Sequence, residues 1–145
     1  MGAATVLMAG GEALPRNVRA IIADCPYSSP VSIIGKVCRE DMRLPFGLLH
    51  PFLRLGARLY GGFRLDPKCG AVEAVKHTGI PIFIAHGDSD DFVPFEMGRE
   101  IFDACAAPEK ELVTIPNAEH GLSYFFDTET YSRRVVAFKL RALES

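Results

Sequence analysis

The chain has 145 residues, of which 48% are hydrophobic and 23% charged. This composition is typical of one soluble globular domain that buries its own core. Sixteen basic and eighteen acidic residues leave a net charge of −2, and no cluster of lysine and arginine stands out in the sequence. A basic surface for nucleic acid is therefore excluded. The most apolar stretch, 44–53, is interrupted by Pro45, His50 and Pro51, so no membrane span is predicted.

Four cysteines are widely spaced and form no Cys-x-x-Cys pair. Without a signal peptide, this usage indicates free thiols in a reducing compartment, and we expect a cytoplasmic protein. The histidines and cysteines also lack metal-ligand spacing, so no metal and no organic cofactor is expected. The cysteines are Cys25, Cys38, Cys69 and Cys105.

The chain opens on a run of small and apolar residues, Met1–Ala9, which ends at Gly10-Gly11. Such a run predicts a short helix that is buried on every side and closed by glycine. Chain termini normally lie at the surface. We therefore expect that further residues preceded Met1 in a parent protein.

Three short β-rich runs follow, at Val18–Cys25, Ile80–Ala85 and Glu111–Ile115. Amphipathic helices are predicted after the second and third of them, at about Pro94–Ala106 and Thr128–Leu143. Strands that alternate with helices indicate an α/β fold, in which about three parallel strands are wrapped by helices. The exception is Ser28–Phe63, a mostly helical, apolar insertion between the first two strands.

Functional groups gather just beyond the carboxyl ends of strands in open parallel sheets. The first run ends in Asp24, the second leads into Asp88, Asp90 and Asp91, and the third leads into His120. A carboxylate and a histidine on adjacent strand ends suit an acid that orients a catalytic imidazole. Asp90 and His120, with one helix and one strand between them, fit that arrangement.

Three segments also carry a family resemblance. The run His86–Pro94 (HGDSDDFVP) resembles the H-G-x-x-D-x-x-V-P acid loop of α/β-hydrolases, and Asn117–Gly121 (NAEHG) resembles their histidine loop. Met1–Ala4 looks like the residues that follow the nucleophile in G-x-S-M-G-A-A. The order matches the serine, acid, histidine order of that fold. The most similar group is the serine aminopeptidase-like, lid-bearing hydrolases of bacteria.

The resemblance implies that residues 1–145 are the C-terminal half of an α/β-hydrolase domain, with the insertion at about 28–63 as a helical lid. Asp90 and His120 would be the acid and the base, and the backbone N–H of Met1 an oxyanion donor. The serine would stand one position before Met1. None of the seven serines here lies in a Gly-x-Ser-x-Gly turn. The parent would cleave a small-molecule ester, thioester or amide, and this chain alone is expected to be inactive.

Several alternatives stay open. Asp24 is the rival acid, because some hydrolases of this fold place the acid after that earlier strand. We expect His50, His77 and His86 to be structural. Asp88 and Asp91 are expected to cap the acid turn and the helix after it. The apolar insertion residues either line a pocket or form ordinary helix contacts, with Arg54 and Arg58 on the solvated face; they are Phe46, Leu48, Leu49, Phe52, Leu55, Leu59 and Tyr60.

A different class of function is a non-catalytic binding domain that has kept a hydrolase-like half-sheet. A small flavodoxin-like domain is disfavoured, since Asp24–Tyr27 is not a phosphate-binding glycine loop. In the parent hydrolase fold, the Val18–Asp24 strand would pair with the strand that carries the nucleophile, and that strand is expected to lie outside this chain. We expect either a second copy of the chain or a retained N-terminal fragment to cover that edge.

Overall fold

A three-stranded parallel sheet in the order β1-β2-β3 forms the centre of the computed structural model, which describes residues 1–66 and 68–144. The strands are β1 (Ile21–Asp24), β2 (Ile82–Gly87) and β3 (Lys110–Ile115). The expected α/β class, strand order and direction are confirmed. Strand β2 extends two residues beyond its predicted end, because His86 and Gly87 continue the pairing with β3.

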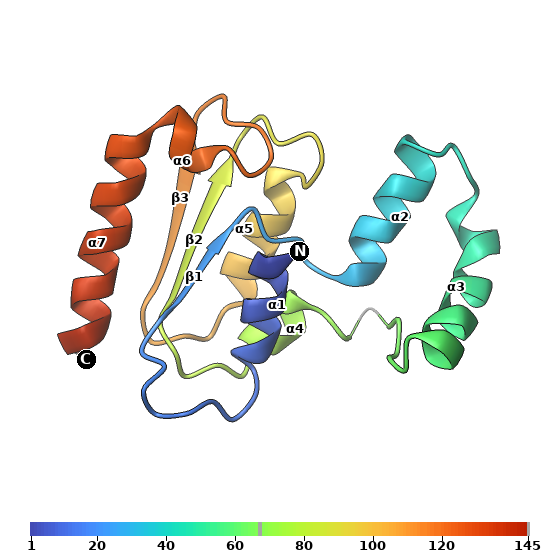
Figure 1. Cartoon of the computed structure of the whole chain (residues 1–145), viewed down its shortest axis with the longest axis horizontal. Helices are drawn as coiled ribbons and strands as arrows, with labels where there is room; N and C mark the ends of the chain where they lie inside the picture. Colours follow the sequence, from blue (N-terminus) through green and yellow to red (C-terminus); the bar gives the residue numbers. More distant parts are fainter. Residues whose placement is uncertain (67, 145) are drawn as a thin grey trace.

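Helices cover both faces of the sheet (Figure 1). On one face α1, α4 and α5 pack on β1 and β2, and on the other α7 packs on β2 and β3. The predicted helices after the second and third strands are both present. The helices are α1 (Gly2–Ala9), α2 (Pro30–Glu40), α3 (Phe46–Tyr60), α4 (Ala71–Val75), α5 (Phe95–Ala104), α6 (Ser123–Phe126) and α7 (Thr128–Glu144).

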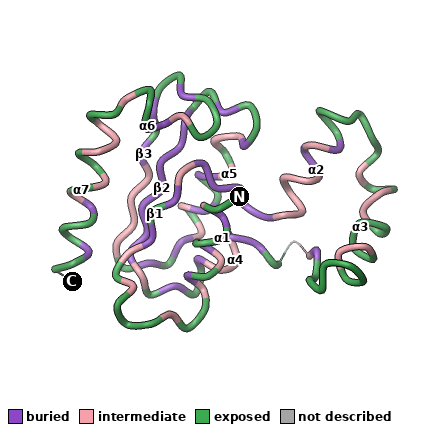
Figure 2. The backbone as a smooth tube through the Cα atoms, in the orientation of Figure 1, coloured by how far each residue is buried: buried purple, intermediate pink, exposed green. Residues whose placement is uncertain are grey.

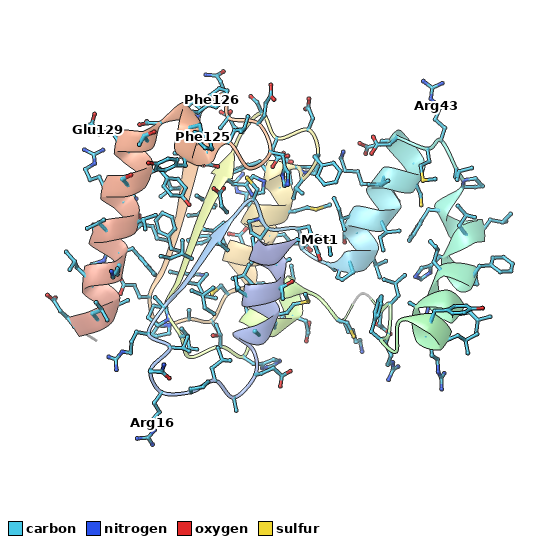
Figure 3. All side chains as sticks on the ribbon, viewed as in Figure 1. Met1, Arg16, Arg43, Phe125, Phe126 and Glu129 are labelled. Carbon is cyan, nitrogen blue, oxygen red and sulfur yellow. The ribbon has the colours of Figure 1, made fainter. Side chains whose placement is uncertain are left out.

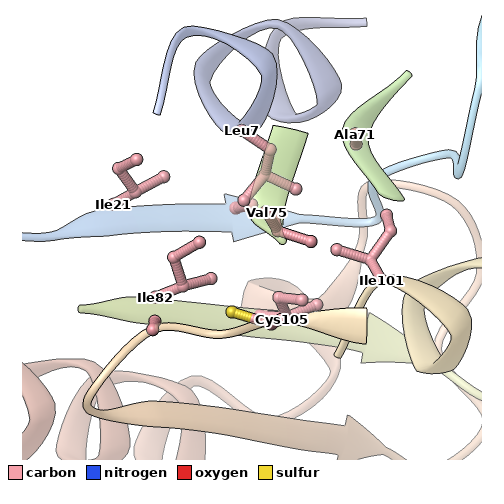
Figure 4. Packing of buried hydrophobic residues seen from close by; sticks show 10 residues of the cluster. Leu7, Ile21, Ala71, Val75, Ile82, Ile101 and Cys105 are labelled. Atoms are coloured by element: carbon pink, nitrogen blue, oxygen red, sulfur yellow. The ribbon is translucent and has the colours of Figure 1, made fainter. Parts of the chain in front are cut away.

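Each face of the sheet has its own apolar core. The first core joins Leu7, Ile21 and Ile82 to residues of α4 and α5, as Figure 4 shows. The second packs Phe83 of β2 against Phe138 of α7, with ring centroids 5.5 Å apart. The side chains of β2 are buried along its whole length, since they serve both cores.

Helix α1 differs from its prediction. Only Ala4 and Leu7 are buried, whereas Val6 is 43% exposed. The reason is its position: α1 packs on β1 and α4, and β1 is an edge strand. A groove of about 260 Å³ runs between them and is lined only by apolar side chains, among them Val6, Val18 and Ile22. The outer edge of β1 pairs with no strand of the described residues.

The insertion forms a hairpin of α2 and α3 that projects away from the sheet (Figures 1 and 2). Its two ends meet at a narrow neck, where the Val72 N–H donates to the Ser28 carbonyl at 3.2 Å. Gly70 packs so closely on Ser28 and Ser29 that a Cβ there would overlap them. None of the helices in residues 1–66 and 68–144 combines the length and the apolarity that a membrane crossing requires.

No residue of α3 is buried. Its apolar side chains form two stripes, of which one faces α2 and the other faces solvent. The second stripe contains Leu48, Phe52, Leu55 and Leu59, which are 55–72% exposed. For these four residues the alternative of ordinary helix contacts is therefore wrong, because this side of α3 faces away from α2 and stays exposed in the described part of the chain.

Candidate active site

Asp90 is held by the turn that follows β2. One carboxylate oxygen, Oδ1, accepts hydrogen bonds from the backbone N–H groups of Phe92 (3.0 Å) and Val93 (2.7 Å). The other, Oδ2, lies 2.8 Å from His120 Nδ1. The residue is only 4% exposed. Asp90 therefore fixes its own turn with one oxygen and presents the other to the imidazole.

His120 lies in the loop after β3, and its side chain is 36% exposed. A carboxylate can only accept, so Nδ1 carries the hydrogen of the bond to Asp90. This tautomer leaves Nε2 with a free lone pair on the opposite side of the ring. The ring packs on Phe92, with centroids 5.1 Å apart. Together these contacts fix the orientation of the imidazole, with Nε2 directed away from Asp90.

The loops after β2 and β3 are tied to each other. Asp88 Oδ1 accepts from the Asn117 N–H at 2.6 Å, and the Ser89 N–H donates to the Ala118 carbonyl at 3.2 Å. Asn117 adopts a φ of 59°, in the left-handed region that asparagine tolerates. The prediction that Asp88 caps its own turn is incomplete, since its main partner lies in the histidine loop. The turn itself is capped by Asp90.

Asp24 is the alternative to Asp90 as the acid partner of His120. Asp24 Oδ1 accepts from Ser123 Oγ at 2.8 Å and from the thiol of Cys25 at 3.2 Å. Burial raises the pKa of Tyr131, and Asp24 raises it further as a nearby negative charge and a hydrogen-bond partner. Asp24 is thus engaged with α6 and α7, whereas His120 bonds to Asp90.

The other histidines lie away from this pair or support it. His86 is fully buried, and its Nε2 lies 2.9 Å from the Val93 carbonyl. Because a carbonyl only accepts, Nε2 carries the hydrogen, and the bond holds the acid turn against β2. His50 stacks on Phe46 inside the insertion, and His77 is exposed after α4. These positions agree with structural roles for all three.

Cys25 is a neighbour of the pair that the sequence did not reveal. It follows β1 with a φ of 50°, and its sulfur, an Asp90 oxygen and a His120 nitrogen lie within 4.8 Å of one another. Burial raises the pKa of the thiol to about 12, and the Gly121 N–H opposes this in part. Metal ligation needs a thiolate and an unprotonated nitrogen. The arrangement instead fits a neutral thiol packed beneath an Asp–His hydrogen bond.

An apolar cavity of about 670 Å³ opens beside His120. Helix α1 contributes Met1 and Met8, α2 contributes Ile33 and Ile34, and the acid loop contributes Phe92. Figure 3 marks Met1 at the start of α1, where the first N–H groups of the helix have no partner within it. Both Met1 and His120 line this cavity, so the start of α1 and the imidazole face the same space.

The insertion contributes to this cavity through α2 and through the segment after α3. No residue of α3 lines it among those described. The alternative in which Phe46, Leu48, Leu49 and Phe52 line this cavity is therefore wrong, because α3 turns away behind α2. The residues that take this place are Phe63, Arg64, Leu65 and Cys69, and no periodicity in the sequence marks them.

No protein-family model and no curated protein matches the sequence. Solved structures do match its fold. The chain is similar to a monoacylglycerol lipase from Paleococcus ferrophilus, with 18% identity, a TM-score of 0.59, and coverage of 95% of this chain and 64% of the lipase. An esterase from Pyrococcus furiosus gives 20% identity and a TM-score of 0.64, with coverage of 92% and 48%.

An α/β-hydrolase from a Penicillium species gives 18% identity and a TM-score of 0.59, with coverage of 96% of this chain and 60% of that protein. The chain therefore spans between about half and two-thirds of the structures that it resembles. At these identities, the likeness establishes the fold of the chain and shows that the chain covers only part of the fold of those proteins.

Proposed function

We propose that this chain, which has the fold of the C-terminal half of an α/β-hydrolase, supplies the acid and the base of a serine hydrolase. The single observation that supports the proposal is the 2.8 Å contact between Asp90 Oδ2 and His120 Nδ1 at the mouth of an apolar cavity. A serine nucleophile would come from outside the chain. The bond cleaved would belong to an ester, a thioester or an amide.

In the proposed reaction, His120 Nε2 takes the proton of the serine hydroxyl while the serine oxygen attacks the carbonyl carbon. Asp90 stabilises the imidazolium that forms. The oxyanion accepts hydrogen bonds from backbone N–H groups, among them the one at Met1, at the start of α1. His120 then returns its proton to the leaving group, and an acyl-enzyme remains. Water, activated by the same histidine, releases the acid and restores the serine.

Hydrolysis of an activated short-chain ester tests the proposal. The chain would be compared with a version that is extended at its N-terminus to include the expected serine. Only the extended protein should give a burst of product, and His120→Ala should abolish it. His77→Ala is the matched control, since His77 is exposed and remote from Asp90. Serine-dependent turnover by the 145-residue chain would show that the nucleophile is misassigned.

The same comparison separates the proposal from a non-catalytic binding domain. A binding domain would bind an ester without hydrolysing it in either form of the protein. An intact Asp90–His120 bond is the observation against that alternative, because a site without chemistry has no need to hold a half-exposed imidazole in one tautomer. We also propose a reducing, cytoplasmic location, since all four cysteines are free and three of them are buried.

A further inference from the structure

Three arginines meet in a second cavity. Arg54 and Arg58 lie one turn apart on α3. The chain turns at Gly62, whose φ is 67°, and this turn brings Arg64 to the same cavity. The cavity has a volume of about 460 Å³, and its other lining residues are Leu55 and Leu65. Both Arg54 and Arg58 are exposed, as expected for residues on a solvated face of the helix. The fold brings the third arginine to them.

The positive charge of this arginine cavity is mostly uncompensated. No carboxylate of residues 1–66 and 68–144 lies within ion-pair distance of any of the three guanidinium groups. Asp66 lies nearby and is half-buried; its pKa is lowered first by the Lys68 N–H and then by Arg54 and Arg64. Like charges one turn apart destabilise a helix. An anion bound among the arginines would relieve that repulsion.

The arginine cavity borders the cavity at His120. Arg64 and Leu65 line both of them. The two cavities thus adjoin at Arg64 and Leu65, and a ligand with an apolar chain beside His120 and an anionic group among the arginines would extend past these two residues. A phosphate fits this set better than a carboxylate does. One guanidinium satisfies the two oxygens of a carboxylate, whereas a terminal phosphate presents three oxygens to several donors.

We propose that Arg54, Arg58 and Arg64 form a subsite for a phosphate group, and that the substrate is an acyl compound that carries this phosphate. The identification of this compound as a substrate rests on the proposed hydrolase function. The phosphate subsite does not, because its three arginines belong to this chain. The three side chains are exposed, so the interaction should be sensitive to salt.

Equilibrium binding to the 145-residue chain tests the proposal without any turnover. The probes are decyl phosphate, decanol, which has the same alkyl chain without the charge, and inorganic phosphate, which has no chain. At low ionic strength, decyl phosphate should bind about tenfold more tightly than either of the other two. Removal of one arginine, as in Arg58→Gln, should weaken decyl phosphate binding about threefold to fivefold, the strength of one exposed ion pair.

The Arg54→Gln/Arg58→Gln double variant should lose the preference for decyl phosphate and leave decanol binding unchanged. Arg16→Gln is the matched control, because Arg16 is an exposed arginine that projects from the loop after α1, away from α3 (Figure 3). Urea unfolding would verify that each variant is folded.

Equal affinity for decyl phosphate and decanol would overturn the proposal. Equal affinity for decyl phosphate and inorganic phosphate would also overturn it, since the cavity would then take a free anion. Failure of the ester assay together with normal phosphate selectivity would refute only the hydrolase function. Normal hydrolysis without that selectivity would refute only the subsite.

Discussion

Gly98 lies directly against the imidazole of His86, so closely that a Cβ on Gly98 would overlap the ring nitrogen Nδ1. Helix α5 therefore packs on the histidine that braces the acid turn. Gly98→Ala should lower the free energy of unfolding by about 1–3 kcal/mol, because the buried ring cannot move aside. Gly56→Ala is the control, since a Cβ there meets no atom within 4 Å. It should raise stability by up to about 1 kcal/mol. Equal effects in urea unfolding would contradict the packing.

Asp90→Asn should change the tautomer of His120 and leave the turn intact. The asparagine oxygen can still accept from the Phe92 and Val93 N–H groups, but its NH₂ group must donate to His120 Nδ1. The ring hydrogen then moves to Nε2. Nitrogen NMR of the imidazole would detect the change, and activity of the extended enzyme should fall about 10⁴-fold. Asp88→Asn, which alters a neighbouring carboxylate, should leave the His120 tautomer as it is.

Stability should decline in alkali between about pH 9 and 12. Burial raises the pKa of Cys25 from 9.0 to about 12, and burial with the nearby Asp24 raises that of Tyr131 from 10.0 to about 12. Both groups are neutral when folded in this range, whereas the unfolded chain loses their protons from about pH 9 upward. The stabilisation is therefore complete below pH 9. Urea unfolding at pH 8 and pH 10.5 would measure the loss, which should be smaller in Tyr131→Phe and Cys25→Ser. An equal loss in those variants would assign it to other groups.

Only one thiol should react quickly in the folded chain. Cys69 is exposed, while Cys25, Cys38 and Cys105 are buried. An aromatic disulfide reagent that releases a coloured thiolate should, at pH 8, react rapidly with one thiol per chain in buffer. In denaturant it should react with all four thiols. Cys69→Ser should remove the fast phase. A fast thiol that remains in that variant would show that at least one of the three buried cysteines is more accessible than its burial indicates.

The open edge of β1 should lead to association. Its outer backbone groups pair with no strand of the described part of the chain, and the groove beside it is apolar. We predict a dimer, or a complex with an N-terminal fragment when one is present. Light scattering after gel filtration would give the mass. Ile22→Lys, which places a charge at this edge, should shift the protein towards the monomer. A monomeric chain at high micromolar concentration would refute the prediction.

The sheet and the acid–histidine pair were predictable because local signals specify them. Short β-rich runs such as Ile80–Ala85 identify the strands, and parallel pairing places the residues after β2 and β3 at one edge. No spacing argument selected Asp90 over Asp88 or Asp91. That choice depended on the family motif, and in the structure Asp90 alone bonds to His120.

The features that could not be predicted depend on contacts between distant segments. The apolar residues of α3 have the spacing of a packed helix, yet only one of its two stripes faces α2 and the other is exposed to solvent. Cys25 lies beside His120 although 95 positions separate them. The arginine cavity arises from a turn at Gly62 that reverses the chain. Periodicity shows which side of a helix is apolar, but not what covers it.

The α2–α3 hairpin is connected to the central fold through a narrow neck. Its two ends meet at Ser28 and Val72, and within it α2 is tied to the acid loop, because Lys36 Nζ donates to the Asp91 carbonyl at 2.5 Å. The central fold therefore depends little on the length or the sequence of the part beyond α2. Closing a longer loop costs little extra free energy. Insertions or exchanges in α3 and in the segment after it would therefore relocate the arginines without moving Asp90 or His120. The arginine cavity and the Asp90–His120 pair are thus free to evolve separately in this chain.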